Sequence, residues 1–404
     1  MIICVFICMF ACQSYANMKK SSDLYNFDDI RPVNDNEVSA TIEELIACEG
    51  LEQALRYVLP AIDWEALKAT LRSCKTKAAF KSSISYDLVM TVVKLSTHSV
   101  TISGGERISK DACMFISNHR DIVLDAAFLN VLLYDIGHGM TQIAIGDNLL
   151  IYSWIKPFFR LNNSFFVKRN LPVREKLEAS RTLSAYIHHT ISETNESVWI
   201  AQREGRAKDS NDTTQTSVLK MLTMGGDRDI LTNLISLNIV PIAITYEYDP
   251  CDYLKAQEFQ LKRDNPDFVK SKRDDLLNME MGILKQKGRV HFTIANPINP
   301  KLKALPPNPN KNELIAEIAS IIDREIYANY RFYPCNYIAY DLLNNSKHFS
   351  TNYNDKELQE FTAYLQRQID KIELPNKDET FLRGKMLEMY SNPLKNHIEN
   401  SPTS

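Results

Sequence analysis

Short apolar runs alternate with helical stretches through the middle of this 404-residue chain. Five runs have the length and the content of β-branched and aromatic residues typical of strands, namely residues 99–103, 114–116, 198–202, 239–246 and 290–295. The segments between them carry apolar residues at three- and four-residue steps, the period of an amphipathic helix. Strands that alternate with helices favour an α/β domain built on a central sheet, here over residues 97–305.

Helical patterns flank this region on both sides. Residues 37–96 repeat apolar positions such as Ile42, Leu45 and Ile46, which predicts a helical N-terminal segment. A run of prolines between residues 297 and 309 marks an exit from the α/β region. Residues 306–404 then form a helical C-terminal segment, with patterns near 311–328, 355–372 and 378–391.

The composition narrows the functional class. Gly and Pro together are 28 of 404 residues, a low share that favours a helix-rich chain over an all-β one. With 47 Lys and Arg against 50 Asp and Glu, the net charge of −3 gives no reason to expect nucleic-acid binding. The eight cysteines and eight histidines show no metal-ligand spacing, so we expect no metal, and reduced thiols in a cytosolic compartment.

Residues 1–36 are interpreted as a leader and a polar linker. Met1 to Cys12 is apolar, but no Lys or Arg precedes it, and twelve residues are too few to span a bilayer. Two interpretations stay open: the first seventeen residues precede a cytoplasmic start at Met18, or they form a signal peptide or short anchor.

Residues 143–167 are rich in Ile, Leu and Phe but are interrupted by Asp147, Lys156 and Arg160. One interpretation is a buried helix with a connector. The other is a tunnel for an acyl chain, or a lip that faces a membrane.

The densest polar cluster next to a predicted strand runs from Asn118 to Asp125. His119 follows the strand closely, and the ends of strands are where open α/β sheets place their ligands. A histidine with a nearby carboxylate can act as a general base, because the carboxylate fixes the tautomer and stabilises the imidazolium. His119-Arg120-Asp121 also suggests a kinase catalytic loop, but position 126 is Ala rather than Asn, and no Asp-Phe-Gly occurs. A serine hydrolase is excluded for lack of a Gly-x-Ser-x-Gly elbow.

Four blocks in a fixed order make the chemistry more specific. They are Asn118-His119-Arg120 through Asp125, then Phe165-Phe166-Val167-Lys168-Arg169, then Glu204-Gly205-Arg206, then Ile239-Val240-Pro241-Ile242-Ala243-Ile244. In this order and at these separations the chain resembles the glycerolipid acyltransferase family, and within it the bacterial glycerol-3-phosphate and lysophospholipid acyltransferases.

The resemblance implies an α/β fold with a three-layer acyltransferase domain and helical segments at both ends. It implies that His119 is the catalytic base and that an aspartate orients it. In the family that aspartate follows the histidine by five positions, but here that position is Leu124, and carboxylates stand at 121 and 125. Asp125 is the favoured partner because it leads into the predicted helix, and Asp121 is the rival.

Basic residues of the second and third blocks are the candidates for phosphate binding. Between residues 150 and 220 eleven Lys or Arg face seven Asp or Glu, a local surplus of four positive charges. Those that flank predicted strands are preferred over Arg174, Lys176 and Arg181, which we assign to a solvated helix face. The predicted substrate-binding residues are Lys168, Arg169, Glu204, Gly205, Arg206 and Lys208.

The expected activity is transfer of a fatty acyl group from acyl-CoA or acyl carrier protein to a hydroxyl of glycerol-3-phosphate or a lysophospholipid. The alternatives are an acceptor of the lyso-aminolipid type, or a non-catalytic lipid-binding member of the fold. No cofactor is expected, because the acyl carrier is a co-substrate. The expected partners are this carrier, the lipid acceptor and the membrane surface, at the cytoplasmic face of the cell membrane as a peripheral protein.

Overall fold

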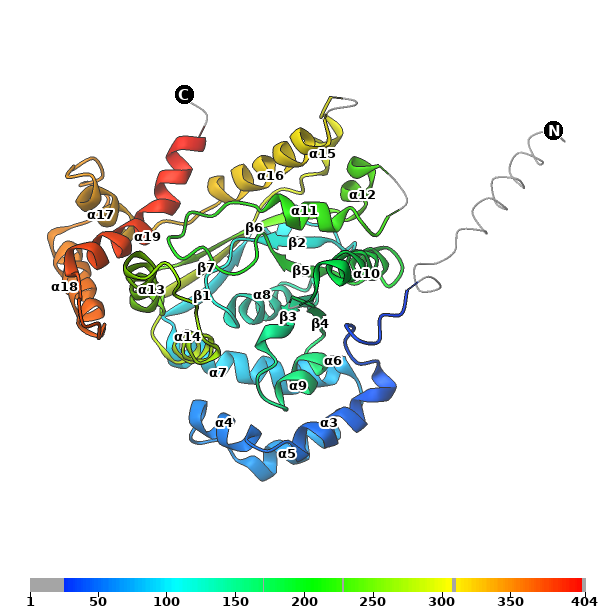
Figure 1. Ribbon diagram of the computed structural model, residues 1–404. Helices are drawn as coiled ribbons and strands as arrows, with labels where there is room; N and C mark the ends of the chain where they lie inside the picture. The colour runs from blue at the N-terminus through cyan, green and yellow to red at the C-terminus, as the bar shows by residue number, and fades with distance from the viewer. Residues whose placement is uncertain (1–24, 170, 227–228, 307–309, 402–404) are drawn as a thin grey trace.

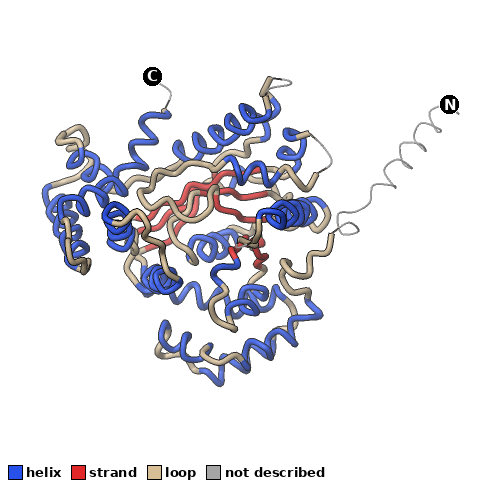
Figure 2. Tube along the Cα trace, viewed as in Figure 1, coloured by secondary structure: helices blue, strands red, loops and turns tan. Residues whose placement is uncertain are grey.

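The computed structural model describes residues 25–169, 171–226, 229–306 and 310–401 (Figure 1). The predicted leader, residues 1–17, lies outside these ranges. Within them one seven-stranded sheet forms the centre of the molecule, and helices surround it (Figure 2). Its strands are β1 (Ser99–Ser103), β2 (Met114–Ser117), β3 (Gln142–Gly146), β4 (Ser164–Val167), β5 (Val198–Ala201), β6 (Ile239–Tyr246) and β7 (Arg289–Ile294).

The strands lie in the order β1-β7-β6-β2-β5-β3-β4. β2 pairs in parallel with β5 and β6, β3 pairs in parallel with β5 and β4, and β1 pairs in parallel with β7. Only the β6–β7 pairing among these is antiparallel. Because β2 is central and its four residues are all buried, the residues that follow it emerge at the middle of the sheet's carboxyl edge.

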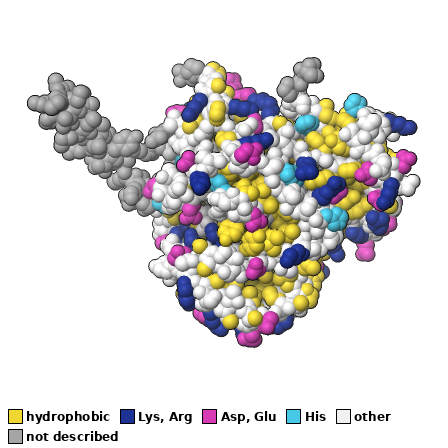
Figure 3. All heavy atoms as spheres, turned by 180° about the vertical axis from the view of Figure 1, so that it is seen from behind, with side chains coloured by type: hydrophobic (Ala, Val, Ile, Leu, Met, Phe, Trp, Pro, Cys, Tyr) yellow, Lys and Arg dark blue, Asp and Glu magenta, His cyan; other side chains and the backbone are white. Residues whose placement is uncertain are grey.

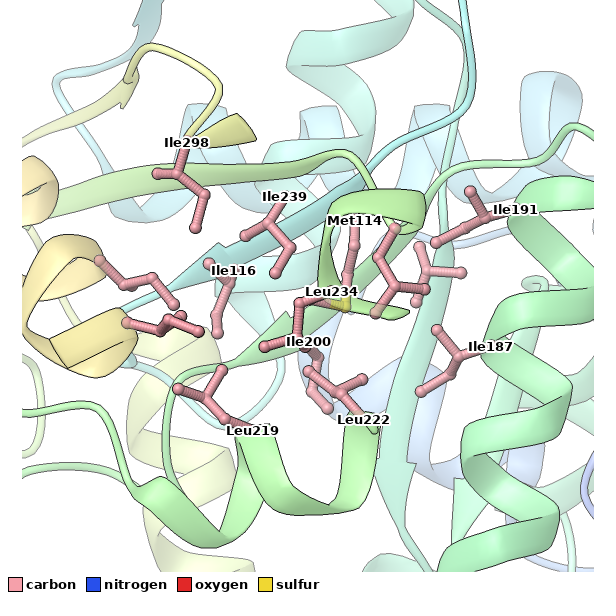
Figure 4. Close-up of a cluster of buried hydrophobic side chains, with 14 of the residues drawn as sticks. Met114, Ile116, Ile187, Ile191, Ile200, Leu219, Leu222, Leu234, Ile239 and Ile298 are labelled. Carbon is pink, nitrogen blue, oxygen red and sulfur yellow. The ribbon is translucent and has the colours of Figure 1, made fainter. Parts of the chain in front are cut away.

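One face of the sheet is covered by a layer of helices. Met114 and Ile116 of β2 point into the apolar cluster between this layer and the sheet, together with Ile200 of β5 (Figure 4). The covering helices are α10 (Val173–Ser192), α11 (Thr216–Leu222), α12 (Ile230–Ser236), α15 (Asn299–Lys303) and α16 (Lys311–Ala328).

The opposite face is covered by α8 (Leu124–Asp135) and α7 (Tyr86–Ser96). Phe115 and Trp199 alternate with the residues of the first cluster and pack on this side, against Phe128 and Leu129 of α8. Alternate residues of one strand therefore supply two cores, as expected for a sheet buried on both faces. The three-layer α/β prediction is confirmed.

The N-terminal segment is helical, as predicted. It comprises η1 (Asp35–Glu37), α3 (Val38–Ala47), α4 (Leu51–Val58), α5 (Trp64–Ser73), α6 (Lys77–Phe80), the π-helical turn η2 (Lys81–Ser85) and α7. A separate cluster that includes Ile42, Leu45 and Phe80 joins these helices to Leu161 of α9 (Ile155–Leu161).

The C-terminal segment is helical too, and packs beside β6 and β7. It contains α17 (Pro334–Leu343), α18 (Asp355–Asp370) and α19 (Glu379–Asn400), of which α17 was not expected from the sequence. Ile338, Leu365 and Met386 form its core together with Ala256 of α13 (Asp252–Asp264). The remaining elements are η3 (Gly105–Arg107), η4 (Asp147–Leu149) and α14 (Lys272–Leu284).

Residues 143–167 differ from the interpretation as a buried helix with a connector. They hold most of β3 and the whole of β4, and between these strands lie only the short 3-10 helix η4 and the seven-residue helix α9. Pairing between β3 and β4, and of β3 with β5, overrides the local apolar pattern. Over the described ranges, no helix has the length and apolar character needed to cross a membrane.

Candidate active site

His119 and Asp125 meet at the carboxyl end of β2. β2 ends at Ser117 and α8 begins only at Leu124, so a six-residue loop separates strand and helix. This late start lets Asp125, in the first turn of α8, turn back to the loop. Its Oδ2 lies 2.8 Å from Nδ1 of His119. The histidine side chain is 13% exposed and the aspartate is fully buried.

The same carboxylate oxygen holds the loop itself. The backbone N–H groups of Arg120 and Asp121 donate to Asp125 Oδ2 at 2.6 and 3.0 Å. The loop therefore wraps around one oxygen, which fixes the histidine in position. With Nδ1 facing Asp125, Nε2 is the ring nitrogen left for a substrate, which is the arrangement a general base requires.

Asp121, the rival carboxylate, has a different set of contacts. Its Oδ1 accepts hydrogen bonds from the backbone N–H groups of Val123 and Leu124 at 2.9 and 2.8 Å, at the start of α8. Burial, helped by the charge of Asp125, raises the pKa of Asp121 above its ordinary value. The structure thus places Asp125 against His119 and Asp121 on the helix terminus.

The strands on either side of β2, β5 and β6, hold the loop in place. The indole of Trp199 on β5 lies edge-on to the His119 ring at 5.9 Å, and its N–H donates to Ser117 Oγ at 3.0 Å. The side-chain amide of Asn118 pairs with both the carbonyl and the N–H of Ile244 on β6, at 2.9 and 2.8 Å. Asn118, which precedes His119, is thereby fixed to β6, the strand that flanks β2 on the side opposite β5.

Arg120 points away from the histidine into a buried ion pair. Its guanidinium donates to both carboxylate oxygens of Asp212, to Oδ1 at 2.9 Å, and both side chains are at most 6% exposed. Tyr330 donates its hydroxyl to the same carboxylate, and Tyr327 to the backbone carbonyl of Asp212. Arg120 of the first block therefore has a structural role. Through Asp212 it is connected to Tyr327 and Tyr330, at and just after the end of α16.

His119 forms part of the wall of a large cavity of about 900 Å³. Apolar side chains of α4, α7, α8, α9 and β3 line much of it, and charged side chains from the ends of β4 and β5 line another part. A cavity of this size and mixed lining suits a long apolar ligand with a charged head. The predicted substrate-binding residues Lys168, Arg169, Glu204, Gly205, Arg206 and Lys208 all line this same cavity.

Lys168 and Arg169 follow β4 directly. Arg169 lies across the end of β3, where a Cβ on Gly146 would come within 2.5 Å of its Nε, so glycine leaves room for the guanidinium. Its Nη1 is 3.7 Å from Glu204 Oε1, a contact that joins the second block to the third. Lys168 is 38% exposed, and its Nζ donates to Asp29 Oδ2 at 3.2 Å at the surface.

The third block follows β5. Gly205 has a φ of 70°, a left-handed conformation that glycine adopts without strain. Arg206 donates to Asn278 of α14 at 2.9 Å, and its buried Nη1 has no hydrogen-bond partner among the described residues. Burial opposes its charge, but nearby Cys251, Asp249 and Asp121 favour it, and the pKa of Arg206 is raised. Lys208 is paired with Glu258, and burial lowers the pKa of Lys208.

Several polar residues of the cavity wall were missed by the sequence analysis, among them Arg203, Lys270 and Asn130. Arg203 directly precedes the third block, Lys270 precedes α14, and Asn130 lies one turn further along α8 than Ala126. Lys176, which the sequence analysis assigned to a solvated face, is exposed but also borders the cavity. The position of Arg203 directly after the strand of residues 198–202 was a usable signal, whereas Lys270 is brought in by a distant segment.

Comparison with known proteins identifies a family for the part of the chain that contains this site. The model of a protein family described as Acyltransferase matches residues 99–245. That range contains β1 to most of β6, the His119–Asp125 pair and both basic blocks. No curated protein matches the sequence. Among solved structures, the 1-acyl-sn-glycerophosphate (LPA) acyltransferase PlsC from Thermotoga maritima is similar at 12% identity and a TM-score of 0.36. The match covers 72% of this chain and 93% of that one.

The matched range places the buried His119–Asp125 pair at the wall of the apolar cavity with its basic rim. Residues 99–245 match the Acyltransferase family, so this part of the chain is an acyltransferase domain. Acyl transfer is accordingly the general activity of this domain.

Proposed function

We propose that this protein transfers a fatty acyl group from acyl-CoA or acyl carrier protein to a hydroxyl of glycerol-3-phosphate or a lysophospholipid. The observation that carries the proposal is the 2.8 Å contact between His119 Nδ1 and Asp125 Oδ2, with His119 in the wall of the 900 Å³ cavity. An intact His–Asp pair also argues against a non-catalytic lipid-binding role.

In the proposed reaction Nε2 of His119 takes the proton of the acceptor hydroxyl as its oxygen attacks the thioester carbonyl. Asp125 stabilises the imidazolium that forms. When the tetrahedral intermediate collapses, the carbon–sulfur bond breaks and the thiolate takes the proton from the imidazolium. The carrier therefore leaves as a free thiol, and the ester product carries the acyl group.

The oxyanion of this intermediate needs hydrogen-bond donors. The backbone N–H groups of Arg120 and Asp121 are already hydrogen-bonded to Asp125, so they hold the loop and do not serve the oxyanion.

Arg203 and Arg206 of the cavity wall offer positive charge for the phosphate of the acceptor or of the carrier. No metal or bound organic cofactor takes part in this scheme.

We further propose a peripheral position on the cytoplasmic face of the cell membrane. The acceptor and product of such a reaction are lipids, and the cavity wall includes apolar residues of α4 together with exposed Lys176 of α10. A basic, partly apolar rim is the surface that anionic lipid attracts.

The direct test is thioester-dependent acylation by purified protein. Labelled acyl-CoA and acyl carrier protein would be supplied in parallel, each with glycerol-3-phosphate, lysophospholipids and lyso-aminolipids as acceptors. His119→Ala should lower turnover by roughly 10²–10⁴-fold while the fold stays intact. His348→Ala, at an exposed histidine after α17, is the matched control and should be normal. Near-normal turnover of the His119 variant would refute the mechanism.

A further inference from the structure

The peptide group between Arg120 and Asp121 is held at both ends. Its N–H, which belongs to Asp121, donates to Asp125 Oδ2 at 3.0 Å, and the same oxygen contacts His119 Nδ1. Its carbonyl, which belongs to Arg120, accepts a hydrogen bond of 3.3 Å from Nζ of Lys255. A continuous series of hydrogen bonds therefore runs from the Lys255 ammonium through this peptide group to the carboxylate of Asp125 and the ring of His119.

Lys255 comes from a distant part of the chain. It lies on α13, outside residues 99–245 that match the family. Its side chain is 1% exposed and forms an ion pair with the side chain of Asp249, which is 6% exposed. The ammonium thus donates to the carboxylate of Asp249 and to the carbonyl of Arg120.

The stability of the fold alone does not account for a charged pair at this position. Taking two charges out of water costs about as much as their attraction returns, so apolar side chains of similar volume stabilise a core as well or better. An apolar side chain cannot donate to the carbonyl of Arg120, a buried residue whose polar groups need partners. The lysine is therefore explained by the loop that it holds.

The C-terminal helices fix the ion pair in turn. The hydroxyl of Tyr390 on α19 accepts the backbone N–H of Asp249 at 3.2 Å and donates to Asp252 at 2.8 Å. Asp249 Oδ1 also accepts the N–H of Cys251 at 2.9 Å, so both oxygens of this carboxylate are engaged. α13 and α19 pack against each other (Figure 1). The position of the loop that carries His119 therefore depends on helices outside the matched range.

We propose that Lys255 is a positioning residue for the His119–Asp125 pair, and that through it the helices beyond residue 245 take part in catalysis. This rests on the proposed function and adds a residue to it. Lys255 is not part of the cavity wall that the described residues form, so it acts through the loop. It keeps the Arg120–Asp121 peptide group where its N–H holds Asp125. Without this bond the loop shifts, and His119 leaves the geometry that proton transfer requires.

The test separates positioning from binding. Purified full-length Lys255→Met protein is assayed with the donor and the acceptor that the wild-type protein uses best. We expect kcat to fall about ten- to a hundredfold, because a small misplacement of a reacting group has an effect of this size. KM should stay within about twofold, since the substitution removes no contact with a substrate. A rise in KM with normal kcat would overturn the proposal.

A combined variant shows whether Lys255 acts through His119. Because His119→Ala already lacks the general base, adding Lys255→Met to it should leave the residual turnover unchanged within about twofold. If the two losses multiply instead, Lys255 contributes by another route and the proposal is wrong.

A second variant keeps the test valid if Lys255→Met fails to fold. Lys255→Met leaves the buried carboxylate of Asp249 unpaired, whereas Lys255→Met combined with Asp249→Asn removes both charges. The combined variant should fold and show the same loss of kcat. Only kcat is compared for it, because the charge of Asp249 also favours the charge of Arg206 in the cavity wall.

Asp341→Asn is the matched control for lost stability. Asp341 is a buried carboxylate of α17 that accepts the N–H of Phe349 and the hydroxyl of Tyr353, both at 3.0 Å. The substitution should lower the melting temperature and leave kcat normal.

The outcomes distinguish this inference from the proposed function. If the wild-type protein transfers acyl groups and Lys255→Met does so with normal kcat, the positioning role is refuted and the proposed function stands. The same holds if Asp341→Asn loses as much kcat as Lys255→Met at an equal fall in melting temperature. If the wild-type protein acylates no acceptor from either carrier, the proposed function fails and the inference fails with it.

Discussion

Nδ1 of His119 lies 2.8 Å from Oδ2 of Asp125, although six positions separate the two residues in the chain. The distance is possible because α8 starts at Leu124, so that Asp125 sits in the first turn, close to the loop. The extra residue relative to the family's spacing is absorbed in this loop. Asp121 meanwhile accepts the N–H groups of Val123 and Leu124 and so satisfies the helix terminus.

The first prediction separates these two carboxylates. Asp125→Asn should lose activity on the order of 10²–10⁴-fold, because an amide cannot hold the histidine tautomer or stabilise the imidazolium. Asp121→Asn keeps an oxygen for the helix terminus and should retain most activity, at a loss of up to about 1 kcal/mol in stability. Turnover and melting temperature of both variants decide the matter. An active Asp125→Asn beside an inactive Asp121→Asn would reverse the assignment.

The second prediction concerns Arg206. Its guanidinium donates a hydrogen bond to Asn278 at 2.9 Å, and Arg206 lines the same cavity as His119. Arg206→Ala should raise KM for a phosphate-bearing acceptor by about ten- to a hundredfold, the value of a lost charge-assisted hydrogen bond. Arg181→Ala, on the outer part of α10 and 52% exposed, is the matched control. If KM rises for the acyl carrier alone, the basic residues serve the carrier instead.

The third prediction is a pH dependence of stability that arises from Asp252. This carboxylate is fully buried, where it accepts the hydroxyls of Tyr364 and Tyr390 at 2.7 and 2.8 Å. Burial raises the pKa of Asp252 to about 7. Between an ordinary value near 4 and about 7, the folded protein holds a proton that the unfolded chain releases. The contribution of this group to stability therefore falls as pH rises through that window, and is constant above it.

Asp252→Asn removes this titration. Melting temperatures of the two proteins, measured from pH 4 to pH 9, should differ by an amount that changes between about pH 4 and 7 and then levels off. The corresponding change in the free energy of unfolding should be of the order of a few kcal/mol. Parallel curves over the whole range would contradict the assignment of the proton to Asp252.

The local sequence pattern was sufficient to predict five of the strands and to single out His119 as a candidate site residue. β1, β2, β5, β6 and β7 are bounded apolar runs, and the strand end next to a histidine–carboxylate cluster points to a site. β3 and β4 were missed because Gln142–Gly146 and Ser164–Val167 are short and are not set apart from the other apolar residues around them by clear turn signals. Their strand state comes from pairing with β5 and with each other, which no local pattern contains.

The apolar walls of the cavity could not be predicted from local sequence patterns for the same reason. The motif blocks predicted the polar rim, including Arg169 and Arg206. The apolar part comes from α4 and α7, whose faces meet β3 only after the chain has folded. α4 and α14 are also joined across sequence by a 2.5 Å hydrogen bond from the hydroxyl of Tyr57 to Glu280. Contacts over such separations depend on the whole fold.

The last prediction concerns membrane attachment. Exposed hydrophobic side chains occur on several parts of the surface, and Figure 3 shows some of them from behind, with Lys and Arg among them. Val173 at the start of α10 is 84% exposed and Val269 before α14 is 83% exposed, and their neighbours Lys176 and Lys270 line the cavity. Exposed apolar residues beside basic ones at the rim of a lipid-sized cavity suit a surface that rests on anionic lipid.

We expect protein that begins at Met18 to sediment with vesicles containing anionic lipid, and to be released at high salt, because screening weakens charge-driven attachment. Val173→Asp and Val269→Asp should each weaken sedimentation, since they place a negative charge and remove an apolar contact at this rim. Ile398→Asp, at a similarly apolar but only 41% exposed position on α19, is the control and should bind normally. If residues 1–17 are needed for any binding, the leader is the anchor and the rim is not. If the rim variants sediment as the control does, the attachment surface lies elsewhere on the molecule.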